Sequence, residues 1–248
     1  MLIKQKIKMS LNQQIESWLS SRKKTFQFIN RPFITLAFAQ SWDGSITTSK
    51  GEAAALSCFA SNQLTHQLRS LHEGILVGIE TVLSDDPQLT VREWVGNNPQ
   101  PIVLDSRLRM PLDSKLHQHP DKKCWVLTVA NDKLSQQSKK TDLEIIQVSQ
   151  QSSDFIPLLP AMRVLRERGI ESLMVEGGAK VITEFLKLGL ADAIVMTVAP
   201  KLIGGYKAVG DLEVEDISSS PNISPIYYEK LDEDLIVWGD LKYSEPDK

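Results

Sequence analysis

One segment, residues 171–205, constrains the possible folds of this chain most, because its hydrophobic period changes twice. In chain order it holds an apolar run, an acidic residue, a glycine pair, an amphipathic stretch and a second apolar run: Ser172–Val175, Glu176, Gly177-Gly178, Val181–Leu188 and Ala193–Val198. Short apolar runs are typical of buried strands, and apolar residues three and four apart are typical of a helix. The segment therefore predicts a strand–turn–helix–strand (βαβ) unit.

The glycine pair lies between the first strand and the helix of this unit. Glycine lets a ligand approach the backbone closely, and the N–H groups at a helix start favour phosphate. Glu176 at the strand end would lie beside the same point. Because the GxGxxG fingerprint is absent, the pair can equally be a plain tight turn with Glu176 in solvent.

The composition predicts a soluble, cytoplasmic globular protein. The chain has 248 residues, 42% hydrophobic and 24% charged, and a formal net charge of −3, which indicates no nucleic-acid footprint. No apolar run approaches the ~20 residues of a membrane helix, and no leader segment is evident. Cys58 and Cys124 lack metal-binding spacing, so we expect reduced thiols and no metal site.

Apolar runs along the chain predict further strands and helices. The expected strands are 33–39, 74–77, 101–104, 124–129, 143–148, 226–230 and 235–242, and the expected helices are 10–24, 57–72 and 158–168, with Ser10 and Ser57 as N-caps. Strands that alternate with helices predict one α/β domain, residues 31–248, with a mostly parallel sheet and an antiparallel end. Residues 1–30 form an N-terminal helical extension to which we assign no chemistry.

Polar residues at predicted strand ends and turns are the other site candidates, since ligands of open α/β sheets bind outside strand ends. Asp85-Asp86-Pro87 predicts a surface turn, acceptors for sugar hydroxyls, or acids that place a cofactor amide. Arg92 suits either a phosphate or a surface ion pair. Ser106, with Arg107 and Arg109, suits either the extra phosphate of NADP or a solvated basic turn. Asp43-Gly44 predicts a hairpin turn.

Five stretches taken together resemble one family: FAQSWDGSI (38–46), LRSLHEGILVGIETVLSDDPQLTVR (68–92), PIVLDSRLRMP (101–111), LMVEGGAKV (173–181) and APKLIGG (199–205). The chain is similar to the reductase domain of bacterial riboflavin biosynthesis over about residues 31–242. The resemblance implies a three-layer α/β/α fold with a mostly parallel mixed sheet, like that of dihydrofolate reductase.

The resemblance also implies a function, in which NADPH reduces the ribosyl group of a phosphoribosylamino pyrimidine to the ribityl group. It implies a homodimer, with a separate deaminase that supplies the substrate. The implied cofactor contacts are Ala39, Thr81, Asp85, Ser106 and the helix start Gly178, Ala179, Lys180 and Val181. The implied substrate contacts are Arg69, Leu89, Arg92 and Glu176. The arginines suit the substrate phosphate, and Glu176, the candidate catalytic residue, suits the ribose hydroxyls.

The chain departs from the family pattern in two places. The family usually has Ser and Trp after its Gly-Glu pair, whereas here Gly51-Glu52 is followed by Ala53–Ala55; the family often has a basic residue where this chain has Ser45. No H-x-E…P-C-x-x-C deaminase motif is present in the sequence. These departures leave two alternatives to riboflavin synthesis: an NADPH reductase of the same fold for another carbonyl or imine, or a non-catalytic NADP-binding partner protein.

Overall fold

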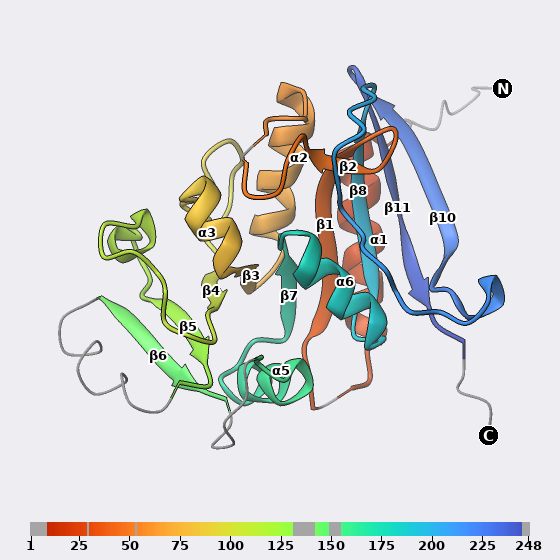
Figure 1. Cartoon of the computed structure of the whole chain (residues 1–248). Coiled ribbons are helices and arrows are strands. Elements are labelled where there is room, and N and C mark those ends of the chain that lie inside the picture. The colour runs from red at the N-terminus through yellow and green to blue at the C-terminus, as the bar shows by residue number, and fades with distance from the viewer. Residues whose placement is uncertain (1–8, 29, 53, 131–141, 149–154, 245–248) are drawn as a thin grey trace, which may run out of the picture.

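The computed structural model describes residues 9–28, 30–52, 54–130, 142–148 and 155–244. Within these residues a nine-stranded sheet runs in the order β10-β11-β8-β1-β7-β3-β4-β5-β6 (Figure 1). Its strands are β1 Phe33–Ser41, β3 Gly74–Gly78, β4 Gln100–Leu104, β5 Cys124–Thr128, β6 Leu143–Gln147, β7 Ser172–Val175, β8 Ala193–Ala199, β10 Asn222–Leu231 and β11 Asp234–Lys242.

Seven neighbouring strands are parallel, and β11 and β10 close one end of the sheet antiparallel. Strands β3 and β7 are buried along their whole length, as expected for central strands covered on both faces. The βαβ unit predicted from residues 171–205 is β7, α6 (Ala179–Lys187) and β8. Strand β1 lies between β7 and β8 in the sheet, which the local pattern does not show.

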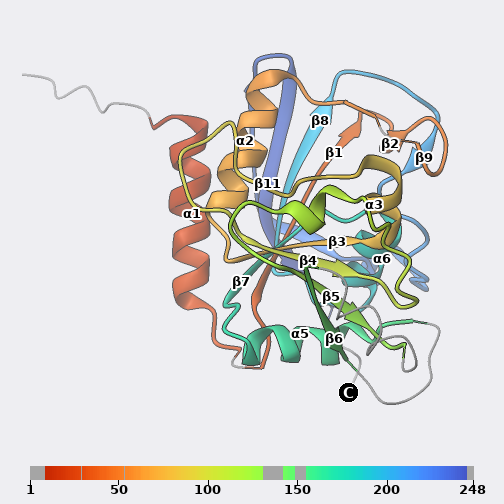
Figure 2. The same cartoon turned by 90° about the vertical axis from the view of Figure 1, so that its left-hand side faces the viewer.

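Helices cover both faces of the sheet and make three layers (Figure 2). Helix α5 (Leu158–Glu167) and α6 pack on one face, around Met162, Phe185 and Leu186. Helices α1 (Leu11–Thr25) and α2 (Phe59–Ser70) lie together on the other face. This confirms the expected α/β class with a mostly parallel mixed sheet.

Helix α1 agrees with the expectation for the N-terminal extension. Ser10 caps it: the Ser10 hydroxyl accepts from the Gln13 backbone N–H, and the Gln13 side chain accepts in return from the Ser10 N–H. The helix buries four side chains against α2 and the sheet: Leu11, Ile15, Trp18 and Leu19. The basic residues of its last turn suit the negative end of the helix dipole.

Two local predictions were wrong, and one helix was not predicted. Helix α2 begins after Cys58 rather than Ser57, and no side chain caps it. Residues 79–85 form helix α3 (Ile79–Asp85), although the short run between Gly78 and Pro87 shows no clear helical period. The Asp43-Gly44 turn does not make a plain hairpin, because strand β2 (Ser45–Thr47) pairs with β9 (Tyr206–Lys207) in a separate two-stranded ribbon.

His72 gives the fold a pH dependence that can be measured. Its ring is buried, with Nδ1 2.7 Å from the Leu68 carbonyl oxygen and Nε2 2.9 Å from the Thr35 hydroxyl. Burial lowers the pKa of His72 to about 4. The unfolded chain, with an ordinary histidine pKa near ~6.5, therefore takes up the proton first as the pH falls. The stability that neutral His72 contributes is complete above that value and is lost between about pH 6.5 and 4.

We expect this loss to approach roughly 3 kcal/mol by pH 4. Urea unfolding of the wild type and of His72→Gln at pH 7 and pH 4 measures it, because the other titrating groups cancel in the comparison. The wild type should lose more stability than the variant over this interval. Equal losses would show that His72 does not carry the effect.

Candidate active site

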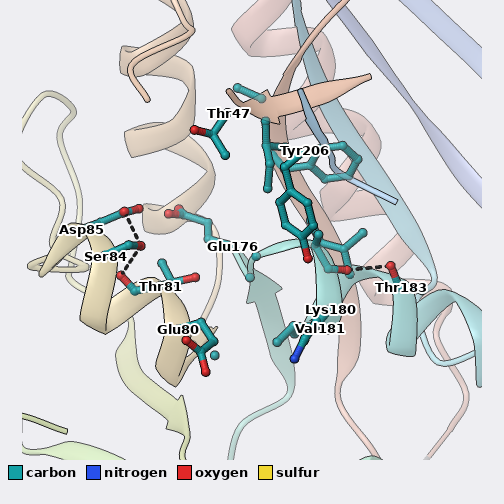
Figure 3. A pocket seen from close by; sticks show the side chains of 18 of the residues that line it. Thr47, Glu80, Thr81, Ser84, Asp85, Glu176, Lys180, Val181, Thr183 and Tyr206 are labelled. Carbon is teal, nitrogen blue, oxygen red and sulfur yellow. Dashed lines mark hydrogen bonds between the residues drawn. The ribbon is translucent and has the colours of Figure 1, made fainter. Parts of the chain in front are cut away.

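A large cleft opens at the carboxyl ends of the parallel strands, between helices α3 and α6 (Figure 3). Its volume is about 1980 Å³. Strand ends contribute Ala39, Gly78 and Leu104, and Glu176 follows directly after β7. This is where an open α/β sheet binds ligands.

The structure brings together most of the residues expected at the site. All eight expected cofactor contacts line the cleft: Ala39, Thr81, Asp85, Ser106, Gly178, Ala179, Lys180 and Val181. Glu176 lines it too, whereas Arg69, Leu89 and Arg92 are not among the lining residues. The expected cofactor surface is thus continuous, and the expected substrate surface reaches the cleft through Glu176.

The start of helix α6 has the properties of an anion site. Gly178 is its N-cap and has no side chain that could accept from the first-turn N–H groups. The helix dipole adds partial positive charge at this point, and Lys180 adds a full one. Thr81 of α3 lies opposite, since a Cβ on Gly178 would lie 3.4 Å from its hydroxyl oxygen. A phosphate between α3 and α6 would therefore meet backbone donors, a hydroxyl and a cation.

Gly177 and Gly178, the glycine pair before α6, have different roles. A Cβ on Gly177 would lie 2.6 Å from the Val181 Cβ, and a Cβ on Gly78 would lie 2.8 Å from a Val181 methyl carbon. Gly177 and Gly78 therefore make room for Val181 and let α6 pack closely on the ends of β7 and β3. Gly178 instead keeps the helix start open toward the cleft.

Glu176 is held by a two-pronged ion pair with Arg69 of α2. The Arg69 Nε and one terminal nitrogen each donate to a different Glu176 oxygen at 2.7 Å, and the other terminal nitrogen donates to the Thr90 carbonyl oxygen at 2.9 Å. Their side chains are only 11% and 15% exposed. Burial disfavours charge on Arg69, but the Glu176 carboxylate outweighs it and raises the pKa of Arg69 above its ordinary value. Glu176 is thus fixed at the cleft wall, with lone pairs left for hydroxyl donors.

Arg92 belongs to the same network through Thr90. Its guanidinium donates to the Thr90 hydroxyl at 2.8 Å, and its backbone N–H donates to the His66 Nδ1 at 3.1 Å. Burial, together with Arg69 and Arg92, lowers the pKa of His66, which keeps this ring nitrogen an acceptor. Leu89 is buried in the core with a positive φ of 54°. The roles of Arg69, Leu89 and Arg92 toward a substrate stay predictions.

The adjacent acids Asp85 and Asp86 have different roles. Asp85 lines the cleft and accepts from the Ser84 hydroxyl at 2.5 Å. Asp86 has a left-handed backbone and accepts from the Ser114 hydroxyl and the Lys115 N–H, both at 2.9 Å. Asp86 therefore fixes the loop behind α3, and Asp85 is the acid available to a ligand.

The loop after β4 presents Ser106, Arg107 and Arg109 to the cleft. Buried Asp105 holds this loop by accepting from the Met110 N–H at 2.9 Å, and burial raises the pKa of Asp105. Arg109 donates to Glu80 of α3 at 2.6 Å. The basic turn expected from the sequence thus faces the cleft.

Some lining residues were not predicted from the sequence: Lys50, Glu80, Tyr206 and Lys207. Glu80 is next to Thr81, but nothing local indicates its pairing with Arg109. Tyr206 follows the Gly204-Gly205 pair, and only the β2–β9 ribbon carries it over the cleft. Ala54 and Ala55 line the cleft as well, whereas Ala53 lies outside the described residues.

Asp43 organises the β2–β9 side of the cleft. Five groups donate to its carboxylate: the hydroxyls of Ser41 and Ser45, the backbone N–H groups of Ile203 and Gly204, and the ammonium of Lys207. The Lys207 ammonium, then the other donors, hold the pKa of Asp43 far below its ordinary value. The carboxylate therefore stays charged and keeps the segment of Tyr206 in place.

Replacing Asp43 with asparagine should loosen this segment, because the amide offers donors where every neighbour already donates. We expect the backbone amides of Ile203 and Gly204 to exchange at least about tenfold faster. Hydrogen exchange resolved at these residues measures it. Asp216→Asn, which removes another turn carboxylate outside the cleft lining, should leave both amides unchanged. Unchanged exchange in Asp43→Asn would contradict the assignment.

Two features are absent from the part of the chain that the structure describes. No helix there is long and apolar enough to cross a membrane. No three histidine, cysteine, aspartate or glutamate side chains there gather in a way that could hold a metal ion.

Comparisons with known proteins identify the family of the chain. The model of the RibD C-terminal domain matches residues 32–237. A riboflavin biosynthesis protein RibD of Aquifex aeolicus is 34% identical over 84% of this chain and 57% of its own length. A 2,5-diamino-6-ribosylamino-4(3H)-pyrimidinone 5′-phosphate reductase of Aquifex aeolicus is 34% identical over 71% of this chain and 80% of its own. The chain thus spans a little over half of the RibD relative.

Solved structures show the same fold. The riboflavin biosynthesis reductase of Saccharomyces cerevisiae superimposes with a TM-score of 0.74 at 26% identity, covering 94% of this chain and all of that one. Acinetobacter baumannii RibD gives a TM-score of 0.73 at 26% identity, covering 86% of this chain and 59% of that one. The chain therefore belongs to the RibD C-terminal domain family.

Proposed function

We propose that this protein is an NADPH-dependent oxidoreductase that reduces the ribosyl group of a phosphoribosylamino pyrimidine to the ribityl group. One observation carries the proposal. A single cleft joins an uncapped helix start and a basic loop, which suit a dinucleotide phosphate, to a fixed carboxylate, which suits sugar hydroxyls. The names of the relatives, a pyrimidinone phosphate reductase among them, support the same reaction class.

The residues present fit NADPH. The first turn of α6 and Thr81 would hold the diphosphate, and Ser106 with Arg109 would hold the 2′-phosphate. Ala39, at the end of β1, has a side chain too small to exclude a flat ring from the strand end. When bound, the cofactor supplies the hydride, so the protein's own tasks are to bind, orient and exclude water.

Glu176 would orient the sugar of the substrate. Both of its oxygens are fixed by Arg69, and each retains acceptor capacity toward the cleft. A polyol chain that donates two hydroxyls to this carboxylate would present C1′ in one orientation. Arg92 lies outside the cleft lining but is joined to the same network through Thr90, and we propose that it meets the phosphate end.

One observation favours a second candidate within the same reaction class. Ala54 and Ala55 line the cleft where the family usually has serine and tryptophan. Methyl groups offer no hydrogen bond and little stacking surface, so this wall suits a different pyrimidine, or another carbonyl or imine. A non-catalytic NADP-binding partner protein is the remaining alternative.

An assay with the two candidate pyrimidines distinguishes these functions. The protein is mixed with NADPH and either the deaminated phosphoribosylamino pyrimidine or its non-deaminated precursor. The nicotinamide absorbance reports turnover, and mass spectrometry reports a product heavier by two hydrogens. Turnover of either supports the proposal and identifies the substrate. NADPH binding without turnover of either would overturn the proposed substrate and leave the alternatives.

The proposal extends to partners and location. We propose a cytoplasmic homodimer that receives its substrate from a deaminase. Within the described residues, strand β10 forms an edge of the sheet and exposes Ile226, Tyr227 and Tyr228, and an apolar edge of this kind is prone to pair. Light scattering on the eluting protein measures the mass; a monomer at micromolar concentration would contradict the dimer.

A further inference from the structure

Glu80 is an acid in a part of the cleft that is otherwise basic. It lies in the first turn of α3 and its carboxylate points into the gap opposite Lys180 of α6 (Figure 3). Arg109 reaches it from the loop after β4 with a hydrogen bond of 2.6 Å. Lys50 and Lys180 act on the same carboxylate through their charges. One carboxylate thus faces three cations where the proposed 2′-phosphate would bind.

The pair is exposed enough to exchange partners. The side chains of Arg109 and Glu80 are 43% and 60% exposed. Exposed ion pairs of this kind are weak, so an incoming phosphate can replace the carboxylate on the guanidinium. Arg69 differs, because its buried fork is fully used by Glu176 and Thr90. Arg109 is therefore a cation that a ligand can recruit.

A carboxylate and a phosphate at one arginine have opposite consequences for the two nicotinamide cofactors. A 2′-phosphate must displace Glu80 from Arg109 and then lie beside its negative charge. An unphosphorylated ribose can instead donate a hydrogen bond from its 2′-hydroxyl to the carboxylate, as it does to the acidic residue of many NAD sites. Glu80 thus penalises the phosphorylated cofactor and favours the unphosphorylated one.

From this arrangement we propose that Glu80 sets the cofactor preference, by competing with the 2′-phosphate for Arg109 and by accepting the 2′-hydroxyl of NADH. The inference rests on the proposed function, because it requires that a nicotinamide dinucleotide binds in this cleft. It adds that the site binds NADH as well as NADPH and that one side chain keeps the two affinities close.

Two pairs of probes test the proposal by differing only in the 2′-phosphate. NADPH and NADH are titrated directly by fluorescence, and 2′,5′-ADP and 5′-AMP are titrated as competitors. Glu80→Gln removes the charge with little change in shape, and should raise the ratio of NADPH to NADH affinity by about fivefold. Arg109→Gln should lower the same ratio. The adenosine probes should follow both changes.

Asp211→Asn is the matched control, since it also removes one negative charge from the cleft lining, and Asp211 accepts instead from the Glu213 backbone N–H at 2.8 Å. The ratio of NADPH to NADH affinity in this control should equal that of the wild type. An unchanged ratio in Glu80→Gln, or an equal change in Asp211→Asn, would overturn the inference and leave the proposed function intact. Damage to the fold would weaken the binding of both probes in each pair alike and leave their affinity ratio unchanged. If the wild type binds neither NADPH nor NADH, the proposed function fails and this inference fails with it.

Discussion

Replacing Glu176 with glutamine is expected to lower kcat/KM for the pyrimidine substrate by roughly 10- to 150-fold. A hydrogen bond to a charged group contributes about 1.5–3 kcal/mol, and each ~1.4 kcal/mol is a factor of ten. The glutamine amide keeps one acceptor and turns its N–H₂ group toward the donors of Arg69. NADPH affinity should stay within about threefold, because the role that we propose for Glu176 is on the substrate side of the cleft.

The same substitution has a structural cost that must be measured separately. Removal of one partner of a buried ion pair costs about 3–5 kcal/mol when the other charge stays buried. Arg69 keeps the Thr90 carbonyl oxygen as an acceptor, so the cost should lie at the lower end of this range. Urea unfolding gives the stability of the variant. Kinetics are recorded under conditions in which the unfolding curve shows the variant to be fully folded.

Two controls separate catalysis from folding. Asp192→Asn weakens a comparable bidentate pair, with Arg31, outside the cleft lining. It should lose stability and keep kcat/KM. A folded Glu176→Gln protein with wild-type kcat/KM would remove Glu176 from the site, and an equal loss of kcat/KM in Asp192→Asn would attribute the effect to folding.

Replacing Gly177 with alanine is expected to weaken NADPH binding at least about tenfold. The added Cβ would lie 2.6 Å and 2.7 Å from the Val181 Cβ and Cγ1. Valine is stiff at χ1 and sits in the first turn of α6, so relief requires a shift of the helix start. The N–H groups that would hold the diphosphate move with it. Overpacking of this kind also costs roughly 1–3 kcal/mol of stability.

A titration of NADPH by fluorescence measures the affinity, and urea unfolding measures the stability. Gly210→Ala is the matched control, because its Cβ would meet nothing closer than the Thr183 hydroxyl at 3.4 Å although Gly210 also lines the cleft. It should bind NADPH within about threefold of the wild type. NADPH affinity in Gly177→Ala equal to that of the control would show that the start of α6 does not hold the cofactor.

Most local features of this fold follow from the sequence, because they depend on neighbours in the chain. Ser10 with the apolar spacing of Leu11, Ile15 and Trp18 specifies α1 and its buried face. The continuous apolar runs of β3 and β7 specify central strands, and the change of period after Gly178 specifies α6. The family resemblance rests on such stretches, and it names Thr81, Asp85 and the start of α6, all of which line the cleft.

The tertiary structure alone decided which of these residues act on one another. Arg69 meets Glu176 across 107 positions, and Asp43 gathers donors from 160 positions away. Glu80 meets Arg109 because α3 packs beside the loop after β4. No local pattern encodes these pairs, since strand order and helix packing bring the side chains together only after the core has formed. The sequence therefore determined most of the elements and suggested the residues of the cleft, and the packing of the sheet determined which charges are bound within the protein and which remain for a ligand.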